Sequence, residues 1–133
     1  MPNDTSHTTD EYVPDDARVT EQNDRFRRSI PSRPPGAPLP GGLQGRVVFT
    51  RTVAARGMLF QLLALLEIAA VSVFEAEDDP DGRHDFGTVE VQGSRVWFKI
   101  DLFSDENMTR GSERPDDPAH TYRVMTVLFP SDW

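Results

Sequence analysis

The sequence contains no cysteine among its 133 residues, and Lys99 is its single lysine beside 13 arginines. The absence of cysteine excludes disulfide bridges, cysteine-ligated zinc and cysteine nucleophiles. Basic side chains are scarce as well, because 14 of them face 22 carboxylates and leave a formal net charge of −8. Broad affinity for nucleic acid requires an excess of lysine and arginine to neutralise phosphates. We therefore expect no direct binding of nucleic acid.

The sequence also lacks the patterns that mark membrane proteins and several common enzyme classes. Glycine-rich phosphate loops, the Gly-x-Ser-x-Gly elbow and the His-Glu-x-x-His zinc motif are all missing. The longest apolar stretch, 58–74, is interrupted by Gln61 and Glu67, which favours a buried helix over a membrane span. The first sixteen residues hold five carboxylates and no apolar core, unlike a secretory signal. A cytoplasmic protein without membrane contact is expected.

The negative charge is concentrated in the middle of the chain. Residues 1–74 carry eight carboxylates and eight arginines, and residues 121–133 also sum to zero. Residues 75–120 hold thirteen carboxylates against five basic side chains, so the whole excess lies there. Such a region is either a heavily solvated surface or a recognition surface for a cation or a basic partner.

Composition divides the chain into four segments. Asp15 or Asp16 caps a short helix in which Val19, Phe26 and Ile30 fall on one stripe. The sequence leaves open whether this helix docks on the folded domain or on a partner. The segments are a disordered tail (1–14), the short helix (15–30), a Pro/Gly-rich linker (31–44) and one folded domain (45–133).

The first part of the folded domain predicts a strand followed by a helix. Residues 46–50 are rich in β-branched and aromatic side chains, which favours a strand. The helix begins at Thr52 and is apolar nearly all round, which is typical of a central core helix. Residues 70–74 either continue this helix or form a further strand.

The second part predicts a hairpin and a last strand. Residues 88–92 and 96–102 alternate in polarity on either side of a Gly93-Ser94 turn, and residues 122–129 form the last strand. The fold class is therefore α+β, with a small antiparallel sheet of three to four strands packed against one main apolar helix. The domain has only 89 residues with which to build a core, so a homodimer would add buried surface.

Several short segments resemble one bacterial family. Residues 78–87 read DDPDGRHDFG, residues 97–101 read WFKID, residues 116–118 read DDP and residues 23–27 read NDRFR. Together they resemble the bacterial domain of unknown function 3768 family. The chain departs from that pattern at Asp79, where the family has Asn, and at Arg83, where it has Glu. The resemblance implies a small bacterial protein, often encoded on plasmids or other mobile DNA, and it carries no established activity.

The acidic loop admits a metal-site hypothesis. Glu77-x-Asp79-x-Asp81-Gly82 resembles the opening of a calcium-binding EF-hand loop, but Thr88 stands where the closing glutamate belongs. A divalent metal there would make hydroxide available for hydrolysis. The alternative is a turn with solvated carboxylates and no cofactor. The candidate metal ligands are Asp79, Asp81, His84, Asp85 and Asp101.

The Lys-Ile-Asp triplet in the hairpin has a simpler structural explanation. Lys99 and Asp101 share one face of a strand, opposite Phe98, and an ion pair of Asp101 with Arg123 on the last strand is expected. Trp97 also lies opposite Phe98, so we expect an indole on the other face of the sheet.

The sequence favours a non-enzymatic, protein-binding module that docks on a basic surface. Because the resemblance implies mobile DNA, the concrete version is an inhibitor of a nucleic-acid-handling host defence complex, that is, an anti-CRISPR or anti-restriction protein. The alternative is a metal-dependent enzyme or a metal-binding protein that uses the His-Asp loop. The candidate partner-binding residues are Glu77, Asp78, Asp79, Asp81, Asp85, Glu113, Asp116, Asp117 and Trp97.

Overall fold

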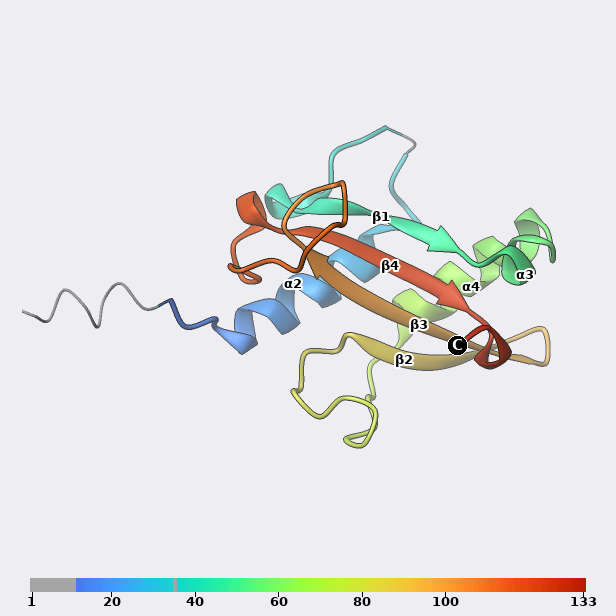
Figure 1. The fold of residues 1–133 in the computed structure, drawn as a ribbon. Coiled ribbons are helices and arrows are strands. Elements are labelled where there is room, and N and C mark those ends of the chain that lie inside the picture. The colour runs from blue at the N-terminus through green and yellow to red at the C-terminus, as the bar shows by residue number, and fades with distance from the viewer. Residues whose placement is uncertain (1–11, 35) are drawn as a thin grey trace, which may run out of the picture.

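The computed structural model describes residues 12–34 and 36–133 (Figure 1). Most of the predicted disordered tail, 1–14, lies outside these residues. The regular elements are α2 (Asp16–Ser29), β1 (Gln44–Phe49), α3 (Arg51–Ala54), α4 (Met58–Ala70), β2 (Phe86–Val91), β3 (Ser94–Phe103) and β4 (Tyr122–Leu128), with the 3₁₀ turns η1 (Pro40–Gly42), η2 (Pro118–His120) and η3 (Pro130–Asp132). No helix in this part of the chain is long and apolar enough to cross a bilayer.

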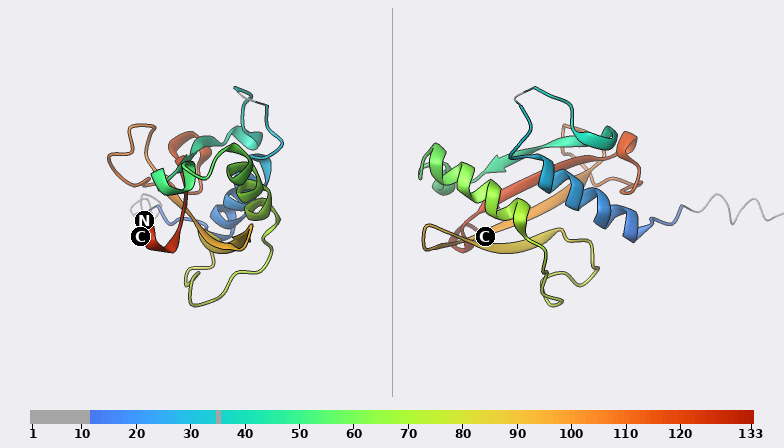
Figure 2. Two further views of the ribbon diagram at one scale, coloured as in Figure 1. Left: turned by 90° about the vertical axis from the view of Figure 1, so that its right-hand side faces the viewer. Right: turned by 180° about the vertical axis from the view of Figure 1, so that it is seen from behind.

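The four strands form one sheet in the order β1-β4-β3-β2. The predicted α+β class is confirmed, but the sheet is mixed, because β1 runs parallel to β4 while β3 is antiparallel to both neighbours. Helices α2 and α4 lie on one face of the sheet, as Figure 2 shows. Their apolar side chains meet Val96, Phe98 and Val127, none of which is exposed.

The predicted hairpin is present with a different turn. Val91 pairs with Ser94, so the two turn residues are Gln92 and Gly93 rather than Gly93 and Ser94. Both have positive φ, 50° and 82°, as a type I′ turn requires. Glycine adopts this conformation without cost, and its place as the second turn residue sets the register.

The predicted core helix is two helices, and it is less buried than expected. Gly57, at φ 95°, separates α3 from α4. Of the α4 side chains, only Phe60, Ala64 and Ile68 are buried. Leu63 and Leu65 are partly buried against the core, whereas Met58, Leu59, Leu62 and Leu66 are exposed. Residues 71–74 form neither helix nor strand.

Helix α2 docks on the domain, which answers the question that the sequence left open. Val19 and Phe26 are fully buried beneath it. The Asp15 side chain caps the helix by accepting hydrogen bonds from the backbone N–H groups of Ala17 and Arg18.

Arg27 joins α2 to α4. Its fully buried guanidinium donates to the carbonyl oxygens of Ile68 and Val71 at 2.6 and 3.0 Å, where α4 ends, and to Asp24 at 2.8 Å. The ring of Phe74 lies 5.3 Å from the guanidinium carbon. A cation at a helix C-terminus is favoured by the unpaired carbonyls there. Burial lowers the pKa of Arg27, but an arginine stays protonated at neutral pH.

Arg123 ties the same helix to β4, which corrects the predicted ion pair with Asp101. Arg123 is opposite Leu102 in the register and faces the helices, where it donates to Asn23 at 2.8 Å and to Gln22 at 3.0 Å. Asp101 pairs instead with Lys99, at 2.6 Å, on the other face of the sheet. Burial lowers the pKa of Arg123 to about 10, which leaves it charged at neutral pH.

We predict that Arg27→Met destabilises the fold by about 3 kcal/mol or more, because it strips the end of α4 of its donor and leaves Asp24 without its cation. Urea unfolding measures the free energy of unfolding. The control is Arg28→Met, which removes an exposed arginine of the same helical turn and should cost less than about 0.5 kcal/mol. Equal stabilities of the two variants would contradict this role.

Candidate functional site

The acidic residues gather around the first half of α2. We call this region the acidic end, made of residues 12–24, 75–85 and 104–120. The two loops within it, 75–85 and 104–120, hold eleven carboxylates and three arginines, which equals the net charge of the whole chain. Figure 1 shows both loops at the side of the molecule from which α2 starts.

Loop 75–85 is fastened along α2 by three contacts besides the pair of His84 with Asp24. Arg83 forms an ion pair with Asp16 at 2.7 Å. The Thr20 hydroxyl donates to the carbonyl oxygen of Gly82 at 2.7 Å, and the Asn23 amide donates to that of Arg83 at 3.0 Å. A loop this polar is therefore held in one place by the helix.

The second loop meets α2 through Asp116. Its carboxylate accepts a hydrogen bond from the backbone N–H of Asp15 at 3.0 Å, and its carbonyl oxygen accepts one from the Gln22 amide at 2.8 Å. The two acidic loops therefore share one scaffold, although the 18 residues of 86–103 separate them in the sequence.

His84 and Asp24 form a pair inside the acidic end. The His84 Nδ1 lies 2.9 and 3.1 Å from the two carboxylate oxygens of Asp24, and its ring stacks on Phe74 with centroids 4.0 Å apart. His84 has a positive φ of 56°, and its backbone N–H donates to Asp79 at 3.0 Å. Asp24 thus bridges His84 and Arg27. Sequence analysis missed the pair because Asp24 and His84 lie 60 residues apart.

Asp85 is the carboxylate of the site whose pKa is raised. It is half-buried, and burial raises its pKa above the ordinary value, with the nearby charges of Asp79 and then Asp81 adding to the effect. Its backbone carbonyl accepts a hydrogen bond from Ile100, so the backbone fixes its position.

The structure does not bring the five candidate metal ligands together. Among residues 12–34 and 36–133, no group of three His, Asp or Glu side chains is arranged to hold a metal ion. His84 is directed at Asp24, Asp79 caps the His84 backbone, and Asp101 pairs with Lys99 in the sheet. The EF-hand-like spacing is therefore used for a turn that closes on itself.

The nine candidate partner-binding residues divide into exposed and structural ones. Asp79 and Asp116 are buried, with 8% and 7% of their surface exposed. Asp79 binds the backbone of its own loop, and Asp116 binds the backbone N–H of Asp15 at the start of α2. Asp117 caps η2, and hydrogen bonds from His120 and then Ala119 lower its pKa. The carboxylates that face solvent are Glu77, Asp78, Asp81 and Glu113.

Trp97 lies away from the acidic end. It stands on the face of the sheet opposite the helices, in edge contact with Phe86 and Trp133 at ring distances of 5.4 and 6.3 Å. Trp133 is 76% exposed. The indole predicted on this face is present, and it belongs to an aromatic group separate from the carboxylates.

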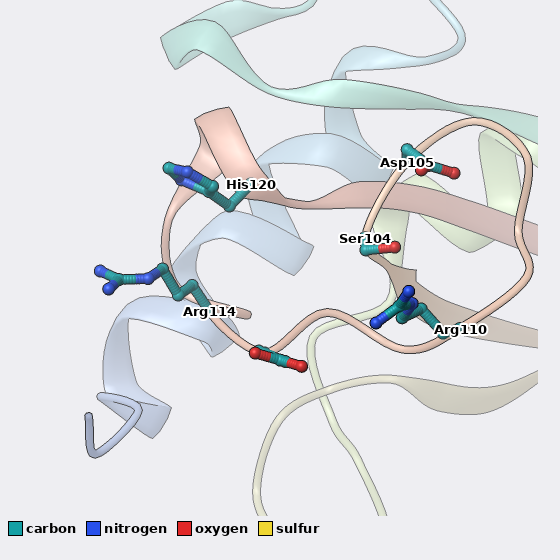
Figure 3. Close-up of a pocket in the computed structure, with 6 residues that line it drawn as sticks. Ser104, Asp105, Arg110, Arg114 and His120 are labelled. Atoms are coloured by element: carbon teal, nitrogen blue, oxygen red, sulfur yellow. The ribbon is translucent and has the colours of Figure 1, made fainter. Parts of the chain in front are cut away.

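A surface hollow of about 310 Å³ opens beside Glu113. Figure 3 shows that its walls come from the loop that follows β3 and from η2. Arginine and carboxylate side chains alternate around it, so their charges offset one another and the hollow has no single sign. The residues that line the hollow are Ser104, Asp105, Arg110, Glu113, Arg114 and His120. Sequence analysis missed the hollow, because these residues come together only when the loop is folded.

We predict that Asp85→Asn raises the melting temperature at pH 7. A folded-state pKa above 3.8 means that the folded chain binds this proton more tightly than the unfolded chain. The resulting penalty grows as the pH rises from 3.8 through the folded-state pKa, and it is complete at neutral pH. The gain in melting temperature should therefore vanish near pH 3, whereas exposed Asp78→Asn should show no such profile. A gain that is equal at both pH values would refute this explanation.

We also predict that metal-stripped protein melts at the same temperature with or without calcium, magnesium, manganese or zinc at about 1 mM. A site filled to 100 times its dissociation constant would add about 2.7 kcal/mol, or several degrees. Thermal melts measure this directly. An ion-selective rise that Asp81→Ala abolishes would restore the metal hypothesis.

The comparisons with known proteins give a family and no activity. A family model described as "Protein of unknown function (DUF3768)" matches residues 49–132, which is more than half of the chain. No curated protein and no solved structure matches it. The matched range includes loop 75–85, loop 104–120 and strands β2, β3 and β4, but only the last residue of β1. The chain therefore belongs to the DUF3768 family.

Proposed function

We propose that this chain is a non-enzymatic protein-binding module whose acidic end docks on a basic surface of another protein. The observation that carries the proposal is the set of exposed carboxylates on the two fastened loops. Glu77, Asp78, Asp81 and Glu113 form no ion pair with another described residue. Unpaired charges on a fixed scaffold can be matched by a partner without a large loss of conformational entropy.

The structural contacts of the polar side chains support a binding role over a catalytic one. His84, the histidine of loop 75–85, is held between Asp24 and the Phe74 ring, and the Asp79 carboxylate is bound to the backbone. These groups stabilise the surface on which the exposed carboxylates stand. The penalty carried by Asp85 fits the same view, because a charge kept at a cost in stability is typical of a functional surface.

The finer proposal is that the partner is a nucleic-acid-handling complex of bacterial host defence. Such complexes present basic channels to phosphates, and an array of carboxylates can occupy the phosphate positions. The small size, the net charge of −8 and the mobile-DNA context implied by the family resemblance favour an anti-CRISPR or anti-restriction inhibitor.

The test is competition for DNA measured by fluorescence anisotropy, with purified CRISPR effector complexes and restriction endonucleases as probes. We expect the wild-type chain to displace labelled DNA from at least one of them, more weakly at higher salt. Glu77→Gln with Asp81→Asn should weaken that competition about tenfold or more. The matched control removes the same charge elsewhere through Glu90→Gln and Asp101→Asn, two residues of the sheet that form ion pairs at the surface.

Two outcomes would overturn the proposal. Competition that is equal in the double variant and in wild type would remove the acidic end from the interface. If the chain neither binds any of these nucleic-acid-handling proteins nor displaces DNA from one, the hypothesis of an inhibitor is rejected.

A further inference from the structure

Strand β2 forms one edge of the sheet, and its outer side has no neighbouring strand in the described chain. The backbone N–H of Ile100 in β3 donates to the carbonyl oxygen of Asp85 at 2.8 Å. Hydrogen bonding to β3 therefore starts at Asp85 and recurs at every second residue. The backbone N–H and C=O groups of Phe86, Thr88 and Glu90 consequently point away from β3. No backbone hydrogen bond from any other described segment reaches them.

This edge is also open to solvent. Thr88 and Glu90 are exposed, and Figure 1 shows β2 as the outermost strand, with loop 75–85 beside its start. The rear view in Figure 2 shows the same arrangement. The strand reads FGTVEV, without proline or lysine, and its register with β3 is continuous, without a bulge. It therefore lacks the devices that most often keep another strand from adding to an edge.

The unpaired charge beside the edge is negative. Loop 75–85 leads directly into β2 and holds six carboxylates against Arg83. The Glu90 carboxylate already pairs with Arg95 at 3.6 Å, so the charge left for a partner is that of the loop. The opposite edge strand, β1, carries the exposed Arg46 and no carboxylate. A basic segment is thus favoured at β2 over β1.

We propose that β2 receives an extended basic segment of the partner as a fifth strand of the sheet. The inference rests on the proposed function, from which it takes the basic character of the partner, and it adds how that partner binds. In strand addition, backbone hydrogen bonds supply affinity and alternate side chains supply specificity. Basic side chains of the segment meet loop 75–85, and apolar ones lie beside Val89, which is partly buried at the margin of the core.

A second copy of the chain suits this edge less well. Strand β2 contains no lysine or arginine, so a second β2 brings no positive charge to the acidic loop. Each copy also has a net charge of −8, and the two copies repel one another. Sedimentation velocity of the free chain tests this occupant. A dimer that Thr88→Pro dissociates would assign the edge to a second copy and overturn the inference.

The main test uses two synthetic peptides of about eight residues in which lysine and valine alternate. One is unmodified, and the other is N-methylated at every residue, so that it keeps its charge but cannot donate backbone hydrogen bonds. Fluorescence anisotropy measures binding to the full chain. We expect the unmodified peptide to bind with a dissociation constant of about 1 mM or less, and the methylated one at least about tenfold more weakly. A peptide of alternating glutamate and valine should not bind.

A single substitution tests the same edge from the side of the protein. Thr88→Pro removes the outward N–H at the middle of β2, and its ring blocks the approach of another strand. Proline is tolerated on an edge strand where the N–H faces solvent, so the fold should persist, which circular dichroism checks. Binding of the unmodified peptide should weaken at least about tenfold. The matched control, Thr88→Val, keeps the N–H and should leave the affinity within about twofold.

Equal binding of the two lysine–valine peptides would overturn strand addition and leave the acidic end as a charged surface only. Absence of binding by the unmodified peptide would overturn it as well. The methylated peptide gives this result without altering the protein, so the test survives if Thr88→Pro unfolds.

The double variant Glu77→Gln with Asp81→Asn separates this inference from the proposed function. We expect it to weaken binding of the unmodified peptide, as Thr88→Pro does. If only Thr88→Pro weakens binding, strand addition stands and the proposed role of the acidic end fails. If only the double variant weakens it, the acidic end stands and strand addition is wrong.

Discussion

The arrangement of the molecule depends on two buried arginines that reach into its helices. Arg27, on α2, supplies donors to the carbonyls at the end of α4, and Arg123, on β4, donates to side chains of α2. A buried guanidinium is costly without partners, so the backbone and amide oxygens around it must stay in place. Helix α2 is thereby an integral part of the fold, although a proline-rich segment separates it from β1.

Local pattern was sufficient for the elements and insufficient for their contacts. Alternation of polarity predicts the β2–β3 hairpin, and a cap at Asp15 or Asp16 predicts the start of α2, where Asp15 is the capping residue. The parallel pairing of β1 with β4 joins segments about 75 residues apart, and nothing local marks it. The burial of α4 was overestimated because hydrophobicity alone does not state how many faces of a helix find a neighbour.

The candidate site shows the same division. The sequence identifies where the carboxylates are concentrated, since composition alone places the charge excess within residues 75–120. It does not tell which carboxylates face solvent. Asp79 and Asp81 are two residues apart in one loop, yet the first closes a turn and the second is exposed. The Asp24–His84 pair could not be predicted from the sequence, because its two residues lie far apart in the chain. The same holds for the contacts of Arg27 with α4 and of Arg123 with α2.

The position of β4 has a consequence for how the protein is made. This strand is one of the two inner strands of the sheet and pairs with both β1 and β3. While the ribosome is still adding β4, β1 has no neighbour and α2 lacks the arginine that holds it. Folding of the sheet must therefore wait until β4 has been synthesised, and the unfinished chain exposes its apolar segments until then.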